Sequence, residues 1–379
     1  MALARRGIPQ SAVTRVLCVN LGSRSAKISL IAVSPNSAPG EPAPAILETE
    51  CGIDALADPA TLEPFESAGV DIVAYRVVRI RRLPAADAVA FDAGMRAAIV
   101  ASQELAPLHT RSVIAAFDAL SARLPHARHV AVFDAAFHRS IPDRAAAYGL
   151  PYADFVAGWR KAGFHGFSHA FTAARVAVLL GDRTPVRKLV GVHLGGGCSV
   201  AAIAGARSID TSMGFTPQDG LLMATRAGTL DAGMLLAYMR EKELSVAAAE
   251  ELISDASGLL GLGGAADMRD IVMWRERGDE RAQLAYDVFV YRTVTAIGAM
   301  AAALNGLDAI AFLGGIGEHM PGVRADICAA LTHLGTHIDQ ERNSADTADA
   351  VISPAGERVV VVRLHVREDW MMALAAVAS

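Results

Sequence analysis

The chain is poor in cysteine, in aromatic side chains and in positive charge. Its 379 residues include four cysteines, and none of them forms a C-x-x-C pair. That spacing disfavours a disulfide framework or a zinc site and fits thiols in a reducing compartment. The net charge of −5 argues against a broad nucleic-acid footprint, because a duplex binder normally carries excess Lys and Arg. We therefore expect no nucleic-acid partner.

Signals for export or for a membrane are also missing. Arg5 and Arg6 are not followed by an apolar core, so we expect no signal peptide. The uncharged run 189–206 is long enough to raise the question of a membrane span, but it holds His193, Ser199 and five glycines. It reads instead as two strands joined by a glycine-rich turn. We expect a soluble, cytoplasmic protein.

What the chain does contain is ample apolar side chain in regular patterns. Hydrophobic residues make up 53% of it and charged residues 20%, which is enough for about two domains of ordinary size. One hairpin is predicted at 15–33, followed by a proline-rich loop at 34–45, and a second hairpin at 188–210. The shared strand–turn–strand layout indicates two related halves facing one ligand. Strands are further expected from 129, at 309–313 and at 359–364; helices at 87–103, 111–123, 152–161, 169–180, 231–241, 245–254, 279–304, near 322–334 and at the C-terminus.

The stretch "VNLGSRSAKISL" at 19–30 interrupts the first hairpin with small, hydroxylated and charged residues. One interpretation is a surface turn, since Asn, Gly and Ser are the usual turn residues. The other is a phosphate site, in which turn amides and Lys27 hold an anion. Two further strands run into glycines, at "HLGGGCS" (193–199) and "LGGIGE" (313–318), where a backbone without Cβ can approach phosphate oxygens. Each alone could be a tight turn, but the three junctions together favour nucleotide binding.

Several charged or imidazole side chains lie near these junctions. Arg76 is in a predicted strand and Arg226 lies between glycines and a helix start, although a lone arginine is more often a surface charge. Histidines stand beside Gly, Pro or Phe at His109, His165, His169 and His193, without any zincin pattern.

Asp134 follows an apolar strand, a position that points toward the site in open α/β folds but also suits a helix N-cap. Mg²⁺ needs only a few hard oxygens from the protein, and Asn20 with one or two acids would suffice.

From Val16 to the C-terminal helix, the chain resembles the acetate kinase family. The resemblance is carried by "VNLGSRSAKISL", "RVV", "LAPLH", "VFDAAFHRSIP", "GFHGFSH", "HLGGGCSVAAI", "DTSMGFTPQDGL", "TRAGTLDAG", "DASGLLGLGGAADMRDI", "LGGIGEHMPGVR" and "GTHIDQERN", in the family's order and spacing. It implies an α/β, two-domain actin-like ATPase fold of duplicated ribonuclease H-like domains, with the nucleotide in the interdomain cleft. The implied domains are 1–137 with 369–379, and 138–368, the latter carrying the interface of a homodimer.

The resemblance also implies reversible, Mg²⁺- or Mn²⁺-dependent phosphorylation of acetate by ATP, giving acetyl phosphate and ADP. Family roles transfer by position as follows: Asn20 and Glu368 bind the metal; Arg76, Asp134, His165 and Arg226 are catalytic; Arg76, Val78, Leu108, His109, Phe164 and Pro217 bind the carboxylate substrate; and Lys27, His193, Leu194, Gly195, Gly196, Gly197, Asp267, Met268, Arg269, Gly314, Gly315, Ile316, Gly317 and Glu318 bind the nucleotide.

The chain departs from the family pattern at several positions. Arg24 stands between two serines where the family has three serines, Gly196 replaces an Asn, and Phe167 replaces a Thr. Two histidines are lost around "AYRVVRIRR", "TRAGT" replaces T-R-S-G-D, and Glu368 is aligned through one acid pair in "HVREDW". Three functions therefore stay open: acetate kinase, a kinase for propionate or another short carboxylate, and a catalytically weak nucleotide-binding regulator.

Overall fold

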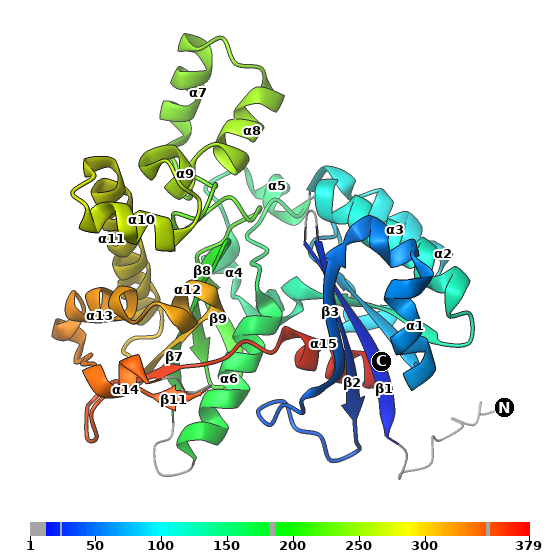
Figure 1. Cartoon of the computed structure of the whole chain (residues 1–379). Coiled ribbons are helices and arrows are strands. Elements are labelled where there is room, and N and C mark those ends of the chain that lie inside the picture. The colour runs from blue at the N-terminus through cyan, green and yellow to red at the C-terminus, as the bar shows by residue number, and fades with distance from the viewer. Residues whose placement is uncertain (1–12, 23–24, 106, 182–185, 346–348) are drawn as a thin grey trace. The chain divides into compact units, whose positions relative to one another are not determined.

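The computed structural model describes residues 13–22, 25–105, 107–181, 186–345 and 349–379. The chain divides into two compact units (Figure 1). The first runs to Ala136 and is completed by Arg367–Ser379, and the second is Phe137–Val366. Within the described residues, no helix combines the length and the apolar run that crossing a bilayer requires.

Each unit is built on one six-stranded mixed sheet. The first has the order β3-β2-β1-β4-β6-β5 and the second β11-β12-β10-β7-β8-β9. The strands of the first are β1 (Thr14–Leu21), β2 (Ser25–Val33), β3 (Ala45–Gly52), β4 (Ile72–Val77), β5 (Ala88–Ala90) and β6 (Arg128–Phe133). Those of the second are β7 (Lys188–Leu194), β8 (Cys198–Ala204), β9 (Arg207–Thr211), β10 (Ala309–Leu313), β11 (Ala350–Val351) and β12 (Val360–Arg363).

The two sheets share one topology, which confirms the two related halves that the hairpins predict. In each, three antiparallel strands (β1–β3 and β7–β9) lead into parallel neighbours (β1-β4-β6 and β7-β10-β12). A short antiparallel strand closes each edge, β5 on β6 and β11 on β12, and in both cases it precedes its partner in sequence. The α/β prediction is thereby confirmed.

The helices agree with the sequence prediction in most places. The first unit has α1 (Pro59–Ala68), α2 (Ala93–Val100), α3 (Pro107–Arg123) and α15 (Glu368–Val377). The second has α4 (Asp143–Ala146), α5 (Tyr152–Val156), α6 (Gly166–Leu180), α7 (Ala232–Glu241), α8 (Val246–Asp255), α9 (Gly258–Gly263), α10 (Met268–Glu276), α11 (Glu280–Ala303), α12 (Gly314–His319), α13 (Pro321–Ala329) and α14 (Gln340–Ser344). Short 3₁₀ turns lie at Ile53–Ala57, Gln103–Leu105, Asp134–Ser140 and Thr332–Leu334.

Three predicted helices were wrong at their N-terminal ends, and the helix predicted at 152–161 was too long. Helix α3 begins at Pro107 rather than at 111, and α5 ends at Val156. The segment 87–103 begins as strand β5, because Ala88–Ala90 pair with Val130–Val132 of β6 before α2 starts. Helix α6 begins at Gly166 rather than at 169, so Ser168, the residue that would have capped a helix starting at 169, is a buried residue within the helix. The residue before α6 is His165, whose left-handed backbone (φ 53°) starts the helix with no side-chain cap bond.

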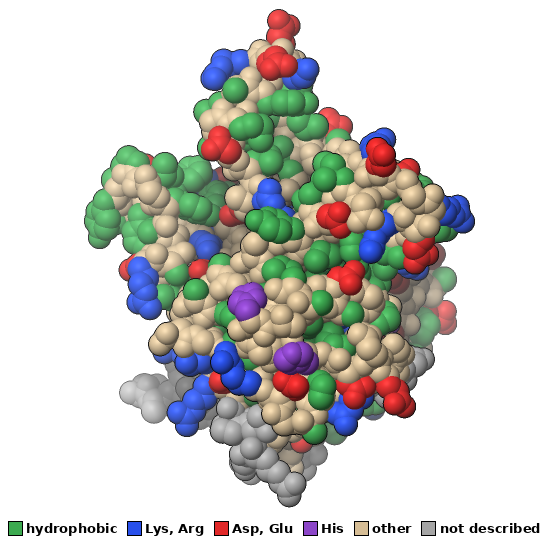
Figure 2. All heavy atoms as spheres, turned by 90° about the vertical axis from the view of Figure 1, so that its left-hand side faces the viewer, with side chains coloured by type: hydrophobic (Ala, Val, Ile, Leu, Met, Phe, Trp, Pro, Cys, Tyr) green, Lys and Arg blue, Asp and Glu red, His purple; other side chains and the backbone are tan. Residues whose placement is uncertain are grey.

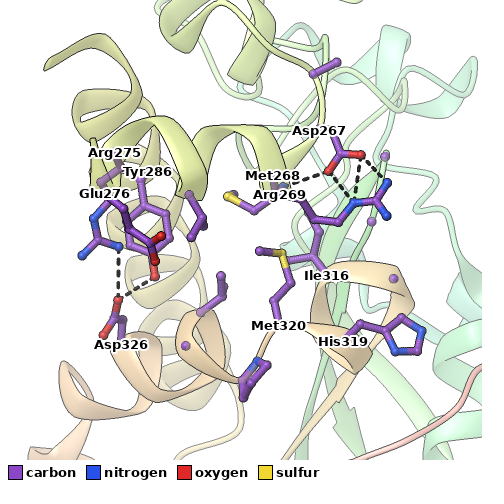
Figure 3. Close-up of a pocket in the computed structure, with 18 residues that line it drawn as sticks. Asp267, Met268, Arg269, Arg275, Glu276, Tyr286, Ile316, His319, Met320 and Asp326 are labelled. Atoms are coloured by element: carbon purple, nitrogen blue, oxygen red, sulfur yellow. Dashed lines mark hydrogen bonds and ion pairs between the residues drawn. The ribbon is translucent and has the colours of Figure 1, made fainter. Parts of the chain in front are cut away.

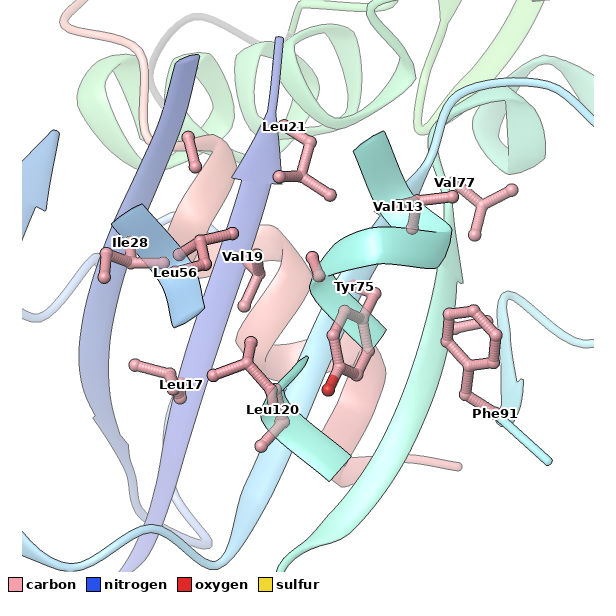
Figure 4. Close-up of a cluster of buried hydrophobic side chains, with 14 of the residues drawn as sticks. Leu17, Val19, Leu21, Ile28, Leu56, Tyr75, Val77, Phe91, Val113 and Leu120 are labelled. Atoms are coloured by element: carbon pink, nitrogen blue, oxygen red, sulfur yellow. The ribbon is translucent and has the colours of Figure 1, made fainter. Parts of the chain in front are cut away.

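The hydrophobic core of the first unit shows which side chains of β1 are buried on one face of the sheet and which face the other side. Leu17, Val19 and Leu21 of β1 alternate onto one face of the sheet, where they pack with Tyr75 and Val77 of β4 (Figure 4). The intervening residues of β1 therefore face the opposite side. There α15 covers the sheet, and Cys18 Sγ lies 3.2 Å from the carbonyl oxygen of Asp369.

Candidate active site

A polar cluster lies where three parallel strands of the first unit end. Asn20 is near the end of β1, Arg76 is near the end of β4, and Asp134 directly follows β6. By the alternation of each strand, all three point away from the Leu17 face and toward α15, whose first residue is Glu368. The carboxyl ends of neighbouring parallel strands meet at one edge of a sheet, the usual place for a site in such folds.

The guanidinium of Arg76 joins this cluster together. Its Nη2 lies 3.1 Å from Asp134 Oδ2, and its Nη1 lies 2.9 Å from Asn20 Oδ1 and 3.1 Å from Glu368 Oε2. Asn20 Nδ2 also donates to Glu368 Oε2 at 2.9 Å. The structure thus brings together four residues predicted for metal binding and catalysis, two of which lie 348 positions apart.

The charges in this cluster act strongly on Arg76. Burial lowers the pKa of Arg76, but attraction to Asp134 and Glu368 outweighs it and leaves the pKa raised above its ordinary value. Two carboxylates face one guanidinium, and the side chain of Asp134 is only 1% exposed. Arg76 Nε is buried and has no hydrogen-bond partner among the described residues. The cluster can accept a cation through its oxygens and an anion through the free N–H.

The other site residues predicted in this unit are Lys27, Val78, Leu108 and His109, which lie on β2, after β4 and in α3. Lys27 is the cross-strand partner of Asn20 and so shares its face, but its Nζ pairs with Glu48 at 3.2 Å. Residues 23 and 24 of the predicted turn lie outside the described residues. Strand β4 ends at Val77, so strand alternation does not extend to Val78. Leu108 and His109 are in the first turn of α3, where the side chain of Leu108 also lies outside the description.

A second cluster lies on the α6 face of the second sheet. His193 of β7 and Ser199 of β8 are directly paired across the strands, so their side chains share one face. His165 and His169 lie one helical turn apart at the start of α6. The rings of His165 and His193 stack with centroids 4.1 Å apart and planes 19° apart. Ser199 Oγ lies 2.9 Å from His165 Nδ1 and 2.8 Å from His169 Nε2.

Arg226 and His165 converge on the glycine-rich turn between β7 and β8. A Cβ added at Gly197 would lie 3.3 Å from His165 Nε2 and 3.4 Å from Arg226 Nη1. Arg226 Nη1 also donates to the carbonyl oxygen of Pro217 at 3.2 Å. Burial lowers the pKa of Arg226, and no described carboxylate lies within ion-pair distance of it. Asp255 attracts this guanidinium from beyond ion-pair distance, so a partly buried donor remains for an anionic ligand.

A cavity of about 810 Å³ opens beside the same turn within the second unit. That volume is within the range of small-molecule sites, roughly 300–1,000 Å³. Figure 3 shows Asp267 paired with Arg269 at one end, and Arg275, Tyr286 and Asp326 gathered at the other. Arg269 Nη2 lies 2.5 Å from Asp267 Oδ2, and these side-chain hydrogen bonds lower the pKa of Asp267.

Seven of the thirteen nucleotide-binding residues predicted in this unit line the cavity. They are Gly195, Gly196, Asp267, Met268, Arg269, Gly315 and Ile316. His193, Leu194, Gly197, Gly314, Gly317 and Glu318 are not among its lining residues. Glu318 instead accepts hydrogen bonds from the backbone of Gly314 and Val366 and from His365 Nδ1, at 3.2, 3.0 and 2.8 Å. Its carboxylate therefore stabilises the chain around α12.

The sequence interpretation missed the far end of the cavity. Tyr286 Oη donates to Asp326 Oδ2 at 2.5 Å, and Arg275 lies over the Tyr286 ring, 4.0 Å from its centroid. These residues come from α13, α11 and α10, and Glu276 lies beside Arg275. No local motif marks them, because their spacing on three helices resembles that of ordinary amphipathic surfaces. A charged residue one turn from a buried aromatic is too common a signal to single them out.

Comparison with known proteins identifies the relatives of the chain. The model of the acetokinase family matches residues 45–374. An acetate kinase of Nostoc punctiforme is 39% identical over 305 residues, 80% of this chain and 75% of the relative. An acetate kinase of Gloeobacter violaceus is 42% identical over 281 residues, 74% of this chain and 69% of the relative.

Solved structures agree with the sequence comparison. The crystal structure of Porphyromonas gingivalis acetate kinase superposes with a TM-score of 0.84 at 29% identity, covering 96% of this chain and 99% of that one. A propionate kinase of Francisella tularensis gives the same four values. The expected two-domain actin-like ATPase fold is thereby confirmed. Because a family model covers most of its length and close relatives span two thirds of it or more, the chain belongs to the acetokinase family.

Proposed function

We propose that the chain is an acetate kinase that transfers the γ-phosphoryl group of ATP to acetate and catalyses the reverse reaction. The observation that carries this proposal is Arg226, a partly buried guanidinium that forms no ion pair with a described carboxylate and lies against Gly197. The glycines before it line a cavity of the size that a nucleotide needs. Membership of the acetokinase family supports the same activity.

The chemistry requires charge neutralisation more than acid–base catalysis. The carboxylate of acetate, with a pKa near 4, is already ionised at neutral pH, so no base has to activate it. The obstacle is the approach of one anion to the γ-phosphate of another. Positioning and positive charge are the main contributions in phosphoryl transfer. Arg226 and His165 would supply donors to the transferring group, and Arg76 would hold the acetate carboxylate.

A divalent cation fits the cluster around Arg76. The side chains of Asn20 and Glu368 lie within hydrogen-bond distance of each other, and each carries a hard oxygen. Such oxygens suit Mg²⁺ or Mn²⁺, with water and phosphate as the remaining ligands. The described residues contain no group of three or more His, Cys, Asp or Glu that could hold a metal by themselves, so a substrate-completed site is the better fit. The cation would neutralise phosphate charge, and Asp134 would keep Arg76 in position.

The remaining predicted roles belong to the same proposal. The methyl end of acetate would contact the predicted substrate residues Val78, Leu108, His109, Phe164 and Pro217. ATP would place its base in the cavity lined by Asp267–Arg269 and Ile316, with Lys27 reaching its phosphates.

A homodimer would cover the exposed apolar side chains of the second unit. Figure 2 shows hydrophobic side chains gathered over the part formed by α7 and α8, where Leu236 and Val246 are 55% and 67% exposed.

The direct test is formation of acetyl phosphate, trapped as the hydroxamate, from ATP, Mg²⁺ and acetate. We expect product in proportion to enzyme, and loss of product when EDTA removes the metal. Bound ATP without any acetyl phosphate would contradict the proposal and favour a nucleotide-binding regulator on the same fold.

Replacing Arg226 by alanine should lower kcat by about 10³-fold, because an arginine that stabilises a transferring phosphoryl group acts on the chemical step. Steady-state kinetics would measure the change, and thermal unfolding would show that the fold is retained. Arg207→Ala, at an exposed position of β9, is the control and should leave kcat unchanged. A near wild-type kcat in Arg226→Ala would exclude this role.

Restoring the family residue by Gly196→Asn should raise kcat. A Cβ at Gly196 meets nothing within 4 Å, so the amide can extend toward the phosphates without strain. At the neighbouring position, Gly197→Ala should lower kcat, because its methyl group would press on His165 and Arg226 at 3.3–3.4 Å. Assays of both variants with ATP and acetate decide the matter. A fall in kcat for Gly196→Asn at unchanged stability would mean that this turn works best with glycine.

Acetate and propionate kinases superpose on the chain equally well, so substrate size needs its own test. If Val78 lies against the methyl end of the substrate, Val78→Ala opens room for roughly one methylene. One methylene in an apolar pocket is worth about 1–3 kcal/mol. We expect kcat/KM for propionate relative to acetate to rise roughly tenfold. Kinetics on acetate, propionate and butyrate would measure it, and an unchanged preference would show that Val78 does not contact the substrate.

A further inference from the structure

Ser199 connects two histidines in a way that gives their hydrogen bonds a direction. Its Oγ lies 2.9 Å from His165 Nδ1 and 2.8 Å from His169 Nε2. A serine hydroxyl carries one proton, so it donates to one of these nitrogens and accepts from the other. One neutral ring must therefore present a protonated nitrogen to Ser199, and the other a bare nitrogen.

The surroundings of His169 decide which ring is the donor. Its side chain is fully buried, and its Nδ1 has no hydrogen-bond partner among the described residues. That nitrogen faces the backbone of Gly191, where an added Cβ would lie 2.8 Å from it. Orphaned buried N–H groups are rarer in proteins than under-satisfied acceptors, so the proton of neutral His169 belongs on Nε2. Burial, with His138 and His193 nearby, lowers the pKa of His169 and keeps it neutral.

The remaining assignments follow in one direction. The Nε2–H of His169 donates to Ser199 Oγ, and the Ser199 hydroxyl donates to Nδ1 of His165. That bond leaves the proton of neutral His165 on Nε2, the nitrogen that lies beside Gly197 and Arg226. Stacking on His193 fixes the plane of the His165 ring, and the bond to Ser199 sets the position of its proton.

We propose that His169 and Ser199 are positioning residues that hold the proton of His165 on Nε2, so that an N–H faces the transferring phosphoryl group. This deepens the proposed function and rests on it for the identity of the anion. The tautomer itself follows from the hydrogen bonds of Ser199 with the two histidines, so it can be read without any substrate. A histidine tautomer set by the bond at its other nitrogen is a general device in catalytic sites.

The test is ¹⁵N NMR of the full chain with labelled histidine, above the pH at which free histidine titrates. We expect His165 with a protonated Nε2 and an unprotonated Nδ1. His169→Gln keeps an N–H for Ser199 and should keep this tautomer, with kcat within about threefold of wild type. His169→Met removes the donor and should give a mixture of tautomers, with kcat about tenfold lower and the KM values unchanged.

A wild-type His165 protonated on Nδ1 would overturn the proposal, as would an unchanged tautomer in His169→Met. Ser199→Ala removes the bridge itself and should also give mixed tautomers, which keeps the question open to test if the methionine variant does not fold. If His165 has the Nε2–H tautomer but the chain forms no acetyl phosphate, the positioning role of His169 and Ser199 is upheld and the proposed function is contradicted.

Discussion

The guanidinium of Arg76 is the interaction on which the first half of the site depends. It joins the ends of β4 and β6 through Asp134, and it joins β1 to α15 through Asn20 and Glu368. Losing one partner of a buried ion pair typically costs about 3–5 kcal/mol, because the other charge stays behind. Two carboxylates and an amide oxygen lie around the same guanidinium. This arrangement supports the proposal that the cluster holds a metal cation and an anionic substrate.

Both units position functional side chains on neighbouring strands, parallel ones in the first unit and antiparallel ones in the second. Residues of adjacent parallel strands that alternate to one face meet at the carboxyl end of the sheet, as Arg76 and Asp134 do. In the second unit the antiparallel pair of His193 and Ser199 meets two histidines from the start of α6. The two sheets share one strand order, and different side chains occupy it in each unit.

Much of this could be predicted from local sequence, and the exceptions have physical causes. Apolar runs that end in glycine predict hairpins and buried strands, so the turn that contains Gly197 was predicted correctly. Strand β5 was missed because three residues have no period of their own and depend on β6 for pairing. The start of α6 was missed because the helix begins after His165, which has a left-handed backbone and forms no side-chain cap bond. The sequence therefore contains no N-cap residue at that position. Glu368 was located only through the family resemblance, and the cavity end at Tyr286 and Asp326 was not found at all.

The central claim is that Asn20 and Glu368 hold a divalent cation in a phosphoryl-transfer site. Electron paramagnetic resonance of Mn²⁺ with the full chain, ADP and acetate tests it most directly. The account predicts a bound Mn²⁺ signal in the wild type and an affinity at least about tenfold weaker in Glu368→Gln, which keeps the shape but removes the charge. Equal Mn²⁺ affinity in the two proteins would contradict it.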